Sequence, residues 1–163
     1  MKSLLLFVTF SMIVAAVCAQ ASDEALDAFA NRIRRALDSG DAEQLVHLAN
    51  WKGLNEMSIP FNRVRFSVIA KKYTQKEFDL TFRSWRPDEP TAVENDLFRK
   101  RLMVPPSHVI TIHIIRSEKA TDINLPIAKI DGQFLICCEQ IVLKRKIKPG
   151  DFSNPPVEAI PRS

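Results

Sequence analysis

Three residues of the chain combine an acid–base side chain with a place in an expected strand. They are Asp79, His113 and Glu139. A strand histidine that faces a cavity can act as acid or base near neutral pH, and a carboxylate can abstract a proton where burial raises its pKa. Asp79, however, alternates with three large apolar residues, so it belongs to a polar row that faces solvent. We therefore expect solvated structural roles for these residues and keep catalysis as the alternative.

The sequence offers no signature of a metal, nucleotide or nucleic-acid site. The histidines are His47, His108 and His113. None of them stands at the spacing that a metal pair needs, so no metal is expected. The four glycines are scattered, no Gly-x-Ser-x-Gly elbow occurs, and aromatic and basic residues do not alternate. We expect no cofactor and no nucleic-acid partner.

The cysteines predict no disulfide. Cys137 and Cys138 are adjacent within an expected strand, where neighbours point to opposite faces and cannot easily bridge each other. We expect both to be free, one buried and one near the surface. A strained vicinal disulfide in a turn and one intermolecular link are the alternatives.

Residues 1–19 have the pattern of a secretory signal peptide, with a lysine, an apolar run and small residues before a cleavage site after Ala19. Lipidation at Cys18 and retention as an uncleaved anchor are the alternatives. The pattern predicts export to the periplasm or the extracellular space, with no stable membrane anchor after cleavage.

Length and composition predict one domain over residues 20–147, followed by a proline-rich, poorly ordered tail over 148–163. The formal charge of the whole chain is +4, which is far from the clustered charge of nucleic-acid binders. The short basic run 144–146 is interpreted as a solvated strand end.

Three helices are expected in the first half of the mature chain. Ser22 caps an amphipathic helix that stops at Gly40, and Asp41 begins a short second helix that ends near Trp51. A third helix opens at Ser58, and its apolar stripe consists of Phe61, Val64 and Val68, widened by Phe66 and Ile69.

Strands are expected in the second half. Residues 78–82 alternate between apolar and polar, residues 109–115 form a strand, and Asp131-Gly132 joins the runs 125–130 and 133–143 into a hairpin. Residues 91–101 are interpreted as a long connection with a short edge strand at Leu97–Phe98. The fold class is therefore α+β, with N-terminal helices packed on one face of an antiparallel sheet. The aromatics expected to line a pocket between the layers are Trp51, Phe61, Phe78 and Phe82.

This layout resembles the nuclear transport factor 2-like superfamily, also called cystatin-like. The resemblance spans roughly residues 25–140 and is carried by the two N-terminal helices, the turn Trp51-Lys52-Gly53 and the hairpin around Asp131-Gly132. It implies a cone in which helices lie in the mouth of a strongly curved sheet, and it implies homodimers through that sheet. Enzymes of the superfamily, such as ketosteroid isomerase, use positioned Asp, His and Tyr residues, but no motif here matches theirs.

Taken together, the sequence predicts an exported, non-catalytic domain that binds a small apolar ligand or another protein. A small cofactor-free isomerase, dehydratase or hydrolase is one alternative. An envelope-associated structural protein is the other.

Overall fold

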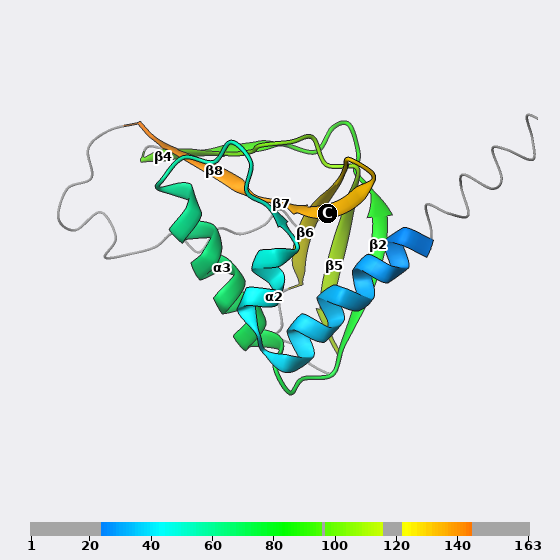
Figure 1. The fold of residues 1–163 in the computed structure, drawn as a ribbon. Coiled ribbons are helices and arrows are strands. Elements are labelled where there is room, and N and C mark those ends of the chain that lie inside the picture. The colour runs from blue at the N-terminus through cyan, green and yellow to red at the C-terminus, as the bar shows by residue number, and fades with distance from the viewer. Residues whose placement is uncertain (1–23, 96, 116–121, 145–163) are drawn as a thin grey trace, which may run out of the picture.

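The computed structural model of the chain describes residues 24–95, 97–115 and 122–144. The expected signal peptide 1–19 with Cys18, the cap at Ser22, and the expected tail 148–163 lie outside the described residues. Within them the chain is mixed α+β, with helices on one side and two sheets on the other (Figure 1). The predicted fold class is confirmed at this level.

A residue suited to capping stands where the first helix ends and where the second begins. The described part of the N-terminal helix covers residues 24–39, and the helix stops at Gly40, whose φ of 67° favours glycine. Helix α2, Ala42–His47, is capped by Asp41, which accepts a hydrogen bond from the Glu43 amide at 3.0 Å. It ends before Trp51 because Ala49–Asn50 instead form strand β1, which pairs in parallel with β7.

Helix α3, Ser58–Tyr73, is predicted correctly as a helix, but the predicted buried stripe is wrong in part. Val64 and Val68 have 63% and 58% of their surface exposed. Phe66 and Ile69 are buried, together with two polar residues, Ser58 and Asn62. The buried face of α3 is therefore polar in the first half of the helix and apolar in the second half.

A polar ladder explains that face. Strand β8, Glu139–Leu143, ends a three-stranded sheet, and side chains from α3 and the turn before it occupy its free edge. Asn62 accepts a hydrogen bond from the Glu139 amide at 3.1 Å and donates one to the Glu139 carbonyl at 2.8 Å. The Ile141 amide donates to the Ser58 hydroxyl at 2.8 Å, and the Ile141 carbonyl accepts from Asn55 at 2.9 Å. These four bonds satisfy backbone groups that a neighbouring strand would otherwise pair with.

The larger sheet has the order β1-β7-β6-β5-β2. Its remaining strands are β2 (Phe78–Ser84), β5 (His108–Ile114), β6 (Ile123–Ile130) and β7 (Gln133–Cys137). These four pair antiparallel, and the turn between β6 and β7 has positive φ at Asp131 (49°) and Gly132 (82°). The predicted Asp-Gly hairpin is confirmed.

The smaller sheet overturns one expectation in part, because the short edge strand expected at Leu97–Phe98 overlaps a longer strand that begins at Phe98. The region interpreted as a long connection forms strands β3 (Ala92–Glu94) and β4 (Phe98–Leu102), which pair with each other and with β8. Asn95 makes the turn by accepting hydrogen bonds from the Leu97 and Phe98 amides, both at 2.9 Å. Only Cys138 separates β7 from β8, so the chain passes from one sheet into the other at that residue.

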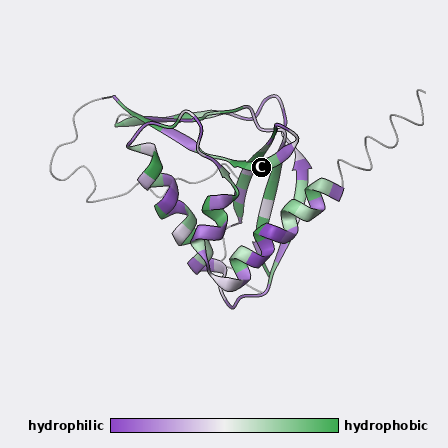
Figure 2. Cartoon of the chain, in the orientation of Figure 1, coloured by the Kyte–Doolittle hydropathy of each residue, from purple (hydrophilic) through white to green (hydrophobic). Residues whose placement is uncertain are grey.

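A filled apolar core joins the helices to the larger sheet. In Figure 2 the strands of this sheet are mostly green, whereas the helices alternate between green and purple. The largest buried side chains include Phe29, Ile33, Leu37, Phe66, Tyr73, Ile110, Ile112, Leu125, Ile127 and Ile136. Tyr73 satisfies its hydroxyl by donating a hydrogen bond to the Ile112 carbonyl at 3.1 Å. Large apolar side chains therefore occupy the space where the family resemblance would place a pocket.

Candidate functional site

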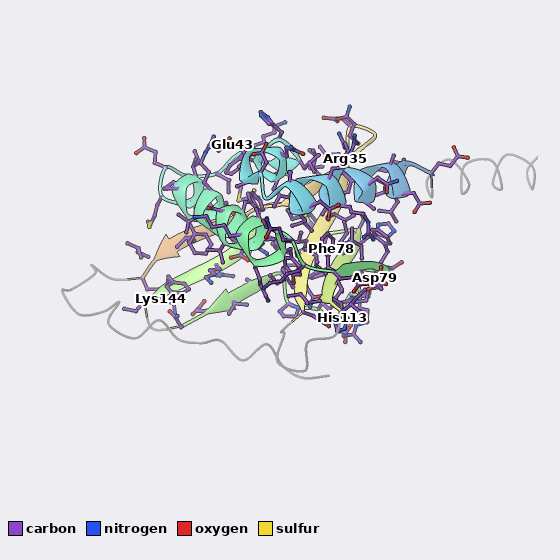
Figure 3. The ribbon with its side chains drawn as sticks, turned by 90° about the horizontal axis from the view of Figure 1, so that it is seen from below. Arg35, Glu43, Phe78, Asp79, His113 and Lys144 are labelled. Carbon is purple, nitrogen blue, oxygen red and sulfur yellow. The ribbon has the colours of Figure 1, made fainter. Side chains whose placement is uncertain are left out.

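Two of the predicted acid–base residues lie side by side on the surface. Asp79 of β2 is opposite His113 of β5 in the antiparallel register, and Figure 3 places both labels in the same part of the molecule. His113 Nδ1 lies 2.5 Å from Asp122 Oδ1, and Arg34 lies 3.7 Å from Asp79. The side chains of Asp79 and His113 are 60% and 54% exposed, so they face solvent rather than an enclosed cavity.

The third predicted residue, Glu139, lies elsewhere. It begins β8 in the smaller sheet, and its carboxylate is 3.2 Å from Arg65 Nη1 of α3, with both side chains mostly buried. That guanidinium nitrogen is buried without a well-formed hydrogen bond, so the contact is one of charge rather than of aligned donor and acceptor. The three candidates do not form one site.

Both cysteines are free and fully buried, with exposed fractions of 0% for Cys137 and 1% for Cys138. The expectation that one lies near the surface is wrong. Cys137 ends β7 and Cys138 links β7 to β8, so the chain is covered by other residues where it passes between the two sheets. Burial raises the pKa of each thiol to about 12, despite the opposing effect of the Arg65 charge.

The predicted pocket-lining aromatics have different environments. Phe78 is buried, with its ring centroid 5.6 Å from that of Tyr73. Phe82 is half-buried against the core, and Phe61 is half-buried beneath the Lys100 ammonium at 5.2 Å. Trp51 alone among the four lines one of the two pockets described below.

The pocket at Trp51 is an open groove between α2 and α3, with a volume of about 400 Å³. We call it the α2–α3 groove, and its lining residues are Val46, His47, Trp51, Ile59 and Arg63. The indole is fixed because Trp51 Nε1 donates a hydrogen bond to the Val46 carbonyl at 2.7 Å. The Arg63 guanidinium lies over that ring, 5.9 Å from its centroid.

The charges at the groove belong to one exposed ion pair. Arg63 Nη1 lies 2.8 Å from Glu43 Oε1, and the two side chains are 51% and 61% exposed. Exposed pairs of this kind contribute about 0–1 kcal/mol, so Arg63 can exchange Glu43 for another anion at little cost. Sequence reasoning missed His47, Ile59 and Arg63 as site residues. The available signal was that Ile59 and Arg63 stand one helical turn apart, after a turn that contains Trp51.

A second, smaller pocket of about 150 Å³ is bounded by residues of both sheets. Trp85 and Pro126 contribute apolar surface, while Lys100, Arg101 and Glu139 contribute charge. Glu139 is already paired with Arg65, and Arg101 Nε donates a hydrogen bond to Gln140 at 2.8 Å. The volume of the second pocket is less than half that of the α2–α3 groove, which makes it the weaker candidate.

Within residues 24–95, 97–115 and 122–144, no group of three or more His, Cys, Asp or Glu side chains is placed to hold a metal ion. In the same ranges, no helix combines the length and apolar character that crossing a bilayer requires. No protein-family model, curated protein or solved structure matches the chain.

Proposed function

We propose that the chain is an exported, non-catalytic binding domain of nuclear transport factor 2-like type, acting in the periplasm or the extracellular space. We further propose that the α2–α3 groove is its binding site. One observation carries this proposal. The groove joins a fixed indole, an apolar wall and an exchangeable guanidinium on the surface of the protein. Such a combination is suited to recognition because the aromatic surface is held in place before binding.

The contents of the core favour binding over catalysis. Chemistry inside the cone would need acids or bases that converge on a cavity. The core instead holds Phe66, Ile112 and Leu125, and the hydroxyl of Tyr73 is engaged with a backbone carbonyl. Passage of the chain from one sheet to the other at Cys138 supports the cone-like curvature that the resemblance implies.

Native mass spectrometry of the protein purified from its own host tests the proposal. We expect a chain that begins at Gln20 and carries a non-covalent small-molecule adduct. Ile59→Asp should remove the adduct because it places a charge in the groove wall. Val68→Asp, at an exposed site on the same helix, should retain it and serves as the matched control. A chain without any adduct, or one that keeps its adduct in Ile59→Asp, would contradict the assignment of the groove.

A further inference from the structure

We infer that the α2–α3 groove takes a small aromatic carboxylate, with its ring against Trp51 and its carboxylate on Arg63. This inference rests on the proposed function and names the class of ligand for that site.

The ring of Trp51 is held on two sides. Its Nε1 is bonded to the Val46 carbonyl at 2.7 Å, and the ring packs edge-on against Phe66, with centroids 6.1 Å apart and planes 84° apart. These contacts leave the indole little freedom to lose on binding. A planar ring gains more from a fixed indole than a flexible chain does, because stacking needs matched orientations.

The space suits one or two fused rings. The volume of about 400 Å³ is within the range of small-molecule sites, roughly 300–1,000 Å³. Val46 is nearly buried, whereas Ile59 is 39% exposed on the opposite side, from α3. A planar ring inserted between Trp51 and Ile59 would cover apolar surface that is now open to water.

The guanidinium of Arg63 favours an anion that can replace Glu43 as its partner. Arg63 presents a planar guanidinium, which matches a carboxylate in two parallel hydrogen bonds and stacks on aromatic faces. It already holds the Glu43 carboxylate at 2.8 Å, which marks where a ligand carboxylate would sit. Helix α3 has no acidic residue along its whole length, so no fixed charge on that helix repels an anion. Arg63 is the single permanent cation of the lining, which fits a monocarboxylate better than a phosphate.

Nuclear magnetic resonance on the full chain, labelled with a nitrogen isotope, tests this inference. The chain has two tryptophans, so the indole N–H signal of Trp85 is an internal reference for that of Trp51. The probes are naphthoate and its neutral isostere naphthamide. We expect naphthoate to shift the Trp51 signal saturably while leaving the Trp85 signal in place. Naphthamide should bind about tenfold more weakly, as expected for the loss of a charged hydrogen bond.

Two variants complete the design. Arg63→Gln should bind naphthoate as weakly as it binds naphthamide. Arg86→Gln, which alters an exposed ion-paired arginine outside the groove, should bind both probes as the parent chain does. Equal affinity for the two probes in the parent chain would overturn the carboxylate class and leave the groove as a binding site. Failure of naphthoate to shift the Trp51 signal would overturn the inference outright, while the adduct experiment would still decide the proposed function.

Discussion

The ladder between α3 and β8 makes a strong prediction about Asn62. Its amide makes three hydrogen bonds, two to the Glu139 backbone and one to the Ser58 carbonyl at 2.7 Å, and the side chain is fully buried. In Asn62→Leu the side chain keeps the number and branching of its heavy atoms but loses all three bonds. The Ser58 carbonyl keeps its helical partner, whereas the amide and carbonyl of Glu139 lose theirs.

The expected loss of stability follows from the unpaired amide and carbonyl of Glu139. Leaving a buried donor or acceptor unpaired costs about 1–3 kcal/mol for each group, so Asn62→Leu should lower the free energy of unfolding by about 2–6 kcal/mol. For a domain of this size, that corresponds to a melting temperature lower by roughly 5–20 °C. Total stabilities are about 5–15 kcal/mol, so the loss is a large share of the whole.

Urea denaturation and amide hydrogen exchange measure the effect. We expect the Glu139 amide to lose protection in Asn62→Leu, because it has no other partner at the edge of β8. Val64→Asn introduces the same polar side chain on the exposed face of α3 and should change stability by less than about 0.5 kcal/mol. Unchanged stability of Asn62→Leu, or continued protection of the Glu139 amide, would refute the claim that the ladder holds α3 to β8.

Three further predictions concern glycines, the tyrosine and the thiols. Gly40 and Gly132 both have positive φ, but an added Cβ at Gly40 would clash with the Thr74 side chain and one at Gly132 would meet no atom. Alanine should therefore cost about 1–2 kcal/mol at Gly132 and more at Gly40, and urea midpoints in the reverse order would contradict this. Burial raises the pKa of Tyr73 to about 12. The unfolded phenol ionises near 10, so stability should be lost as pH rises from about 10 towards 12, with phenolate absorbance as the measurement. At pH 8 the thiols of Cys137 and Cys138 should react with a thiol reagent about a hundredfold more slowly in the folded chain than in the unfolded chain. Equal rates in the two states would contradict this and would show that the segment joining β7 to β8 opens in the folded protein.

Elements whose signals are local could be predicted from the sequence. The caps at Gly40 and Asp41 and the turn at Asp131-Gly132 each depend on residues within a few positions of one another. Their conformations are therefore determined by the chain nearby and survive whatever tertiary packing surrounds them. The same holds for residues 109–115, whose β-branched run favours a strand in almost any context.

The smaller sheet could not be predicted in this way. Strand β4 contains three consecutive basic residues, 99–101, and its pattern is typical of a solvated loop. Its register is set by β8, where Phe98 pairs with Leu143 and Leu102 with Glu139, roughly forty positions later in the chain. Pairing over that separation is a tertiary event that no local pattern records.

The buried face of α3 differs from the predicted stripe for a physical reason, and the same reason explains how the groove is built. The stripe predicted for α3 contains only apolar residues and leaves out Ser58 and Asn62, but a free strand edge needs polar partners as much as water does. Each of these two residues is followed by a groove residue, Ile59 and Arg63, and successive positions in a helix are turned by about 100°. Fixing the first pair on β8 therefore directs the second pair towards Trp51. The ladder and the groove are consequences of one rotation of α3, which the contacts with β8 fix.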